Sequence, residues 1–133
     1  RDVRRPGSAE FTVEHYLDGP LEYLKDLIRR EAESNGFDPY GAEVQHFLER
    51  LEREAVVPEE RLRPRRVCQA CYHSPGFDRE ERYWLELQQA WSIYRWLERE
   101  VRQGCGIIDE NFLRWYLEGE VEFLERQVGR LNR

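Results

Sequence analysis

The segment from Cys68 to His73 has the side chains best suited to chemistry in this chain. It reads Cys-Gln-Ala-Cys-Tyr-His, with two thiols at Cys-x2-Cys spacing and an imidazole two residues after Cys71. Structural zinc sites have four such ligands, so the run is one ligand short. In an up-and-down bundle, His15 lies at the correct end to be the fourth, whereas a helix of roughly 35–40 Å separates Cys105 from the run.

Structural or disulfide-bonded thiols are the preferred interpretation of the same run, and zinc is the alternative. The three cysteines Cys68, Cys71 and Cys105 are the disulfide candidates, and their odd number leaves at least one without an internal partner. Covalent haem attachment requires Cys-x-x-Cys-His, and here Tyr72 intervenes. A thioredoxin-like site would need a preceding strand, which the pattern lacks. We therefore predict no cofactor and no bound metal.

Glu43 and His46 form the Glu-x-x-His spacing that di-iron helical bundles use twice. The chain has no second copy, and Val44 between the two occupies the apolar stripe, so a solvated turn is expected. The glutamates of the last predicted helix are expected to form a solvated face as well: Glu118, Glu120, Glu122 and Glu125. No Ser/His/Asp set or phosphate-binding glycine loop is recognisable. The sequence predicts that the protein is not an enzyme.

The longest helical pattern covers residues 78–103 and contains three of the four tryptophans. At about 100° per residue, its apolar side chains fall on two faces rather than on one stripe. One broad face includes Trp84, Trp91 and Tyr94. The other consists of Leu85, Ile93 and Trp96. This helix should therefore contact neighbours on both sides.

Shorter helical patterns surround this one. Pro20 suits the first turn of a helix that ends at Asn35-Gly36, and Pro39 that of a second helix. Residues 58–76 read as a loop, and Asp109 can cap the last helix. No stretch alternates like a strand. We predict an all-α fold with about four main helices in hairpins: residues 1–17 form an N-terminal arm with a short helix, and residues 18–133 form a single helical domain.

The apolar positions of these helices predict an interaction surface. The last helix has a wide apolar arc and is expected to cover the broad face of the long helix, whereas the second helix has too narrow a stripe to cover much. We therefore assign Leu85, Ile93, Trp96 and Trp115 to a partner interface. The competing interpretation is a small core in which the protein's own helices cover both faces.

Composition limits the partners that the chain can have. Of its 133 residues 36% are charged, the net charge is -6, and acidic residues alternate with the arginines along the helices. No basic face is left for a phosphate backbone, so nucleic acid is an unsuitable partner. No apolar run approaches the ~20 residues of a membrane-spanning helix. The chain begins with an arginine-rich stretch, RDVRR, that fits either an organelle presequence remnant or a cloning remnant.

Three segments together resemble one family. Residues 18–30 read DGPLEYLKDLIRR, an Asp-x-Pro start of an amphipathic helix with a basic-acidic pair before an Ile. Residues 97–105 read LEREVRQGC, a basic helix end followed by a cysteine, and residues 120–122 read EVE. In these features the chain is similar to the PDSW accessory subunit family of mitochondrial respiratory complex I. The family has a second cysteine in the next helix, where this chain reads Trp-Tyr-Leu at 115–117, so the family's disulfide cannot form in the same way.

This resemblance implies a non-catalytic accessory subunit of the complex I membrane arm. Such a subunit lies on the intermembrane-space side of the mitochondrial inner membrane, peripheral to the membrane and not spanning it. It binds neighbouring protein subunits and contributes to assembly and stability, without carrying electrons or protons. The alternative function is a small zinc-binding or thiol-redox helical module centred on Cys68, Cys71 and His73.

Overall fold

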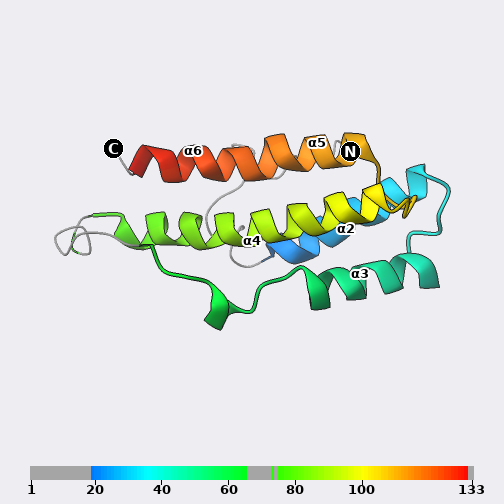
Figure 1. Ribbon diagram of the computed structural model, residues 1–133, viewed down its shortest axis with the longest axis horizontal. Coiled ribbons are helices and arrows are strands. Elements are labelled where there is room, and N and C mark those ends of the chain that lie inside the picture. Colours follow the sequence, from blue (N-terminus) through cyan, green and yellow to red (C-terminus); the bar gives the residue numbers. More distant parts are fainter. Residues whose placement is uncertain (1–18, 66–72, 74, 132–133) are drawn as a thin grey trace.

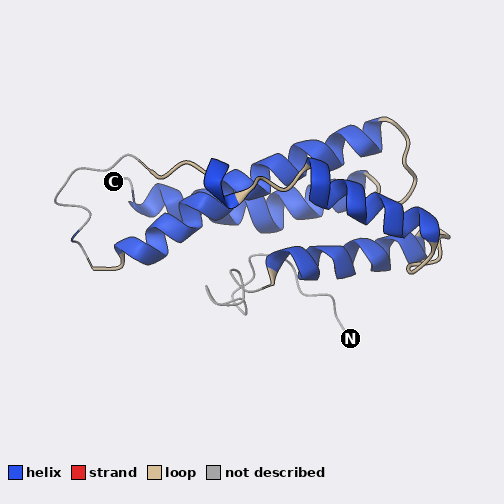
Figure 2. Cartoon of the chain, turned by 90° about the horizontal axis from the view of Figure 1, so that it is seen from below, coloured by secondary structure: helices blue, strands red, loops and turns tan. Residues whose placement is uncertain are grey.

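The structure is a computed structural model that describes residues 19–65, 73 and 75–131. These residues form helices and no strand, which confirms the all-α prediction (Figures 1 and 2). Its elements are α2 (Pro20–Ser34), α3 (Ala42–Glu54), a 3₁₀ turn (Glu59–Arg61), α4 (Phe77–Arg102), α5 (Glu110–Tyr116), a π-helical turn (Leu117–Val121) and α6 (Glu122–Leu131). The arm and short helix predicted for residues 1–17 lie outside the described residues.

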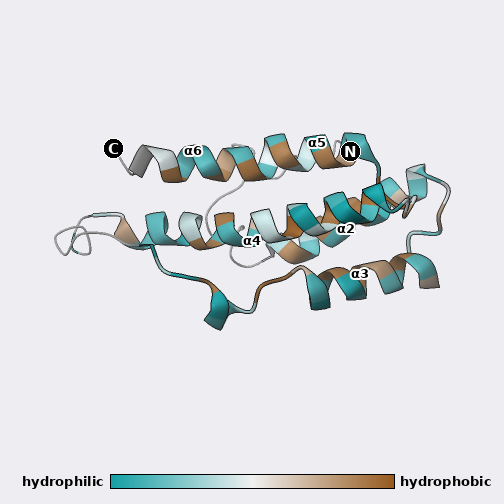
Figure 3. Cartoon of the chain, in the orientation of Figure 1, coloured by the Kyte–Doolittle hydropathy of each residue, from teal (hydrophilic) through white to brown (hydrophobic). Residues whose placement is uncertain are grey.

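Helix α4 is the centre of the fold. The chain turns back after it, so that α5, the π turn and α6 lie along one side of α4, while α3 lies on another side (Figure 1). Figure 3 shows hydrophobic residues on the facing sides of these helices. The ring of Tyr83 on α4 meets that of Phe123 on α6 edge to face, with centroids 6.4 Å apart. The prediction that the last helix is a main neighbour of the long one is confirmed.

Some helix ends follow the sequence signals and others do not. Pro20 begins α2, and Gly36 follows that helix with a φ of 90° that favours glycine. Helix α3 was expected to begin at Pro39, but it begins at Ala42. The Asp38 carboxylate instead accepts a hydrogen bond from the Tyr40 N–H at 3.0 Å. Asp38 therefore stabilises a turn before the helix rather than the helix itself.

The chain after α3 runs along α4 as an extended strap, which we define as residues 55–65. Side chains of α4 hold its backbone. The Ser92 hydroxyl donates to the Ala55 carbonyl at 2.6 Å. The Gln89 amide both accepts from the Val57 N–H at 2.6 Å and donates to the Val57 carbonyl at 2.9 Å. One glutamine side chain thus satisfies both backbone groups of a strap residue.

The strap continues toward the beginning of α4. Both the Trp84 indole N–H and the Gln88 amide donate to the Arg63 carbonyl at 2.8 Å, and Gln88 also accepts from the Arg63 N–H at 3.0 Å. Glu81 then accepts from the Arg65 N–H at 3.1 Å. These polar residues recur at three- or four-residue spacing along α4, so they form a ladder for the strap. Trp84 therefore bonds to the strap, although its place on the broad apolar face predicted contact with the last helix.

A π-helical turn interrupts the last helix at Leu117–Val121. Such a turn inserts an extra residue and rotates the positions that follow it. Glu120, expected on a solvated face, is only 6% exposed as a result, whereas Glu118 and Glu125 are exposed as predicted. Glu120 and Glu86 lie near the fully buried Tyr116, and burial, followed by these two carboxylates, raises the pKa of Tyr116 well above its ordinary value.

Candidate interaction site

The structure decides part of the predicted thiol chemistry. Cys68, Cys71 and His15 lie outside the described residues, and His73 is exposed. Cys105 is a half-buried free thiol, with its Sγ 3.8 Å from the Ile108 carbonyl oxygen. Because Cys68 and Cys71 are its possible partners, the assignment of Cys105 as a disulfide candidate stays a prediction. Among the described residues, no group of three His, Cys, Asp or Glu side chains is arranged to hold a metal ion.

Glu43 and His46 line a pocket between α3 and the end of α4. Both are exposed, and Val44 between them is buried, as the pattern predicted. The pocket has a volume of about 320 Å³, and Cys105 also lines it. Arg50 and Glu100 also line it, and they form an ion pair in which Arg50 contacts both oxygens of Glu100. This guanidinium is already occupied by a carboxylate, so Arg50 offers no free cation to a substrate in the pocket.

Two of the predicted interface residues belong to the core. Trp96 is 1% exposed and Ile93 is 6% exposed, so assigning them to a partner interface is wrong for the chain as it folds here. The Trp96 ring lies 5.1 Å from that of Phe47 on α3, and its indole N–H donates to Glu54 at 3.0 Å. Helix α3 therefore covers this face of α4, although its stripe appeared too narrow. Leu85 is half-buried on the same helix.

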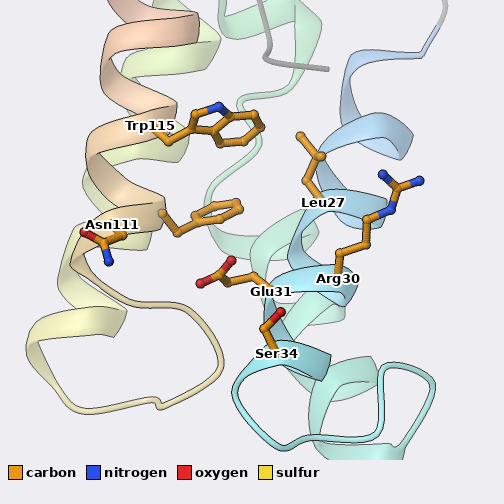
Figure 4. A pocket seen from close by; sticks show the side chains of 7 residues that line it. Leu27, Arg30, Glu31, Ser34, Asn111 and Trp115 are labelled. Carbon is orange, nitrogen blue, oxygen red and sulfur yellow. The ribbon is translucent and has the colours of Figure 1, made fainter. Parts of the chain in front are cut away.

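Trp115, the fourth predicted interface residue, lies at a groove between α2 and α5 (Figure 4). It is half-buried, and its ring is 5.7 Å from that of Phe112, one turn earlier on α5. Leu27 lies opposite Trp115 on α2 (Figure 4), and Phe112 also lines the groove. The groove has a volume of about 280 Å³, and four polar residues complete its lining: Arg30, Glu31, Ser34 and Asn111.

The two walls of the groove are fixed at one end. The Asn35 amide at the end of α2 donates to the Ile107 carbonyl at 3.1 Å, which ties α2 to the loop before α5. Asp109 begins α5 by accepting the Phe112 N–H at 3.0 Å, which confirms the predicted cap. Rigid walls around an apolar floor are suited to receiving a partner side chain, because little order is lost on binding.

Glu31 gives this groove its electrostatic character. Burial, and then the nearby Asp109 carboxylate, raises the pKa of Glu31 above its ordinary value. Glu31 projects from α2 on the same side as Ser34, toward α5 (Figure 4). The groove therefore combines an apolar floor with a carboxyl group that is poorly solvated. A partner that donates a hydrogen bond here would relieve part of that cost.

The sequence pointed to Trp115 but not to the rest of this groove. Leu27 belongs to the buried set of α2 and Phe112 to that of α5, and nothing in the sequence separated either from ordinary core residues. Their helix spacing gives a usable signal: Leu27 and Glu31 are four residues apart, and Phe112 and Trp115 are three apart, so each pair shares a face. Only the three-dimensional arrangement shows that the two faces lie opposite each other.

Comparisons of the chain with models of protein families, with curated proteins and with solved structures found no match. In the described part of the chain, every helix is too short or too polar to cross a membrane. A proposal about function therefore rests on the fold, the groove and the sequence features described above.

Proposed function

We propose that the protein is a non-catalytic subunit that binds other proteins within a larger assembly. The observation that carries this proposal is the groove between α2 and α5, where the half-buried Trp115 lies beside the buried Leu27 and Phe112. Trp115 remains half-buried although it lies beside the core. An apolar side chain on a helix of a neighbouring subunit would bury the exposed part of the Trp115 ring, at a gain of about 25 cal/mol per Å² of apolar surface.

The resemblance to the PDSW family suggests which assembly this is. It supports a place in the membrane arm of mitochondrial complex I, peripheral to the inner membrane on its intermembrane-space side. There the subunit would contribute to assembly and stability. The groove is compatible with this non-catalytic role. It lies between α2 and α5 and could receive a side chain of a partner, which requires no catalytic group.

Native purification of the tagged full chain from mitochondria tests the proposal. We expect subunits of complex I to co-purify with it. Trp115→Ser should weaken this association by about thirtyfold or more, the loss typical of a tryptophan at the centre of an interface. Asn111→Arg, at the exposed rim, should block the groove without removing core atoms. Tyr40→Ser is the matched control, since Tyr40 is 78% exposed and does not line the groove.

Two results would contradict the proposal. In the first, the wild-type chain is recovered alone from the soluble fraction. In the second, Asn111→Arg and Trp115→Ser, shown by circular dichroism to be folded, co-purify with the same subunits in the same amounts as the wild type. Recovery with a different set of membrane-protein subunits would overturn the complex I assignment and retain the interaction function.

A further inference from the structure

Four side chains form an exposed stripe on the second half of α4. They are Trp91, Arg95, Arg99 and Arg102, which we name the arginine stripe. Their spacing of four, four and three residues places them on one face of the helix. The three arginines are exposed and Trp91 is half-buried. The Arg95 guanidinium lies 5.3 Å from the centroid of the Trp91 ring, so the tryptophan holds the first arginine in place.

Within residues 91–102, the second half of α4, the three arginines of the stripe are exposed and the other residues are buried or half-buried. Toward the beginning of the helix, Trp84 and Gln88 bind the strap through the Arg63 carbonyl. On the face next to the stripe, Trp96 meets α3. The remaining side faces α5, the π turn and α6. The arginine stripe lies between the two covered sides, along the last three turns of the helix.

The charges of the stripe are only partly neutralised by the chain. Some of the other described arginines, such as Arg29 and Arg50, pair with carboxylates. Arg102 pairs with Glu98 at 3.2 Å. Within the described residues, Arg95 and Arg99 form no ion pair. The helix dipole favours cations in the last turn, which accounts for Arg99 and Arg102 but not for Arg95, two turns from the end.

We propose that the arginine stripe binds an acidic segment, rich in Asp and Glu, of a partner protein. This inference rests on the proposed function and names the chemistry of one partner. Guanidinium groups accept carboxylates through two parallel hydrogen bonds, and tryptophan and arginine are the residues that most often dominate binding energy at interfaces. Charge complementarity favours an acidic protein segment. A membrane or nucleic-acid surface would need a wider basic field than three arginines along one helix face with Glu98 beside them.

A binding titration tests the stripe directly. The full chain is titrated into a fluorescein-labelled oligoglutamate peptide at low salt, with an oligolysine peptide as the probe of opposite charge. We expect Arg95→Gln/Arg99→Gln to weaken oligoglutamate binding by about fivefold or more, which is what two exposed ion pairs supply together. Arg53→Gln/Arg114→Gln is the matched control, because it removes the same charge from exposed positions on α3 and α5. It should leave the affinity within about twofold of the wild-type value.

Equal weakening by the two double variants would overturn the proposal, since binding would then follow net charge alone. Preference for phosphatidylserine vesicles or for single-stranded RNA over oligoglutamate would also overturn it. The native purification separates this inference from the proposed function. If Arg95→Gln/Arg99→Gln recovers the whole assembly as well as the wild type does, the stripe is not a docking surface but the subunit role stands. If the wild type recovers nothing, the subunit role itself fails.

Discussion

Arg50 on α3 and Glu100 on α4 form a two-bond ion pair, with nitrogen–oxygen distances of 2.9 and 2.8 Å. Glu100 is buried, and the Arg50 guanidinium also lies 5.3 Å from the centroid of the Trp96 ring. The pair therefore joins the two helices at the same place where α3 covers the long helix. It fixes a face of α4 that would otherwise expose a tryptophan.

Replacing Arg50 by alanine should destabilise the protein by about 3 kcal/mol, because it leaves a buried carboxylate without its partner. Urea unfolding followed by tryptophan fluorescence measures this. Arg53→Ala is the control, since Arg53 lies at the exposed side of the same helix, and should change the stability by less than about 0.5 kcal/mol. Equal effects of the two substitutions would show that the pair does not join the helices. The double variant Arg50→Met/Glu100→Met should recover part of the loss, since it removes both charges together.

Gln89→Ala should release the strap from α4. The substitution leaves the Val57 N–H and carbonyl without the side-chain amide that satisfies both, at a cost of about 1–3 kcal/mol. Arg61 and Arg63 in the strap should then be cut faster by trypsin, because cleavage requires local opening of the chain. Limited proteolysis with mass spectrometry identifies the sites. Gln103→Ala, at an exposed residue after α4, is the control and should leave the cleavage rate unchanged.

The features of the fold that depend on interactions between residues close in the sequence could be predicted, whereas several that depend on contacts between distant residues could not. The bounds of α4 were predicted to within one residue, because periodicity and Gly76 and Gly104 around it are local signals. The capping of α5 by Asp109 is also local. The start of α3 was missed because Asp38 has two local options, a helix cap or a turn, and the sequence around it suits both.

The partner interface was partly wrong for a non-local reason. A helical projection shows that Trp96 and Ile93 differ in direction from Trp91, but it does not show which element of the chain lies there. Phe47, Glu54 and the strap cover that direction, through contacts that span tens of residues. The burial of Glu120 was missed for a different reason. The π turn at Leu117–Val121 changes which residues of the last helix face the core, and no residue pattern in the sequence predicts such a turn.

Glu86 should make the stability of the protein depend on pH. Burial raises the pKa of Glu86 to about 7, well above the value of an unfolded chain. A carboxyl with a raised folded pKa binds more protons in the folded state, so stability falls as pH rises from about 4.5 to about 7 and stays reduced above. The loss should amount to about 2–4 kcal/mol.

Glu86→Gln should remove most of this dependence and stabilise the protein at pH 8. Urea midpoints measured between pH 5 and pH 8 test it. Glu125→Gln, at an exposed position on α6, is the control and should keep the wild-type slope. If the wild-type protein becomes more stable as the pH rises from 5 to 8, ionisation of Glu86 does not destabilise the folded state, and the prediction is wrong.

Asp109→Asn should lower the pKa of Glu31 toward its ordinary value. Asparagine caps a helix about as well as aspartate, so the bond from the Phe112 N–H is retained while the negative charge beside Glu31 is lost. Burial, the larger cause of the shift, remains, so only part of it should disappear. NMR titration of the Glu31 side-chain carboxyl measures this. Asp109→Ala separates the two roles of the residue: it should lower the same pKa but also cost about 1 kcal/mol of stability, because the cap is lost. If Asp109→Asn leaves the Glu31 titration unchanged, the two carboxyl groups do not interact, and burial alone explains the poorly solvated carboxyl in the groove.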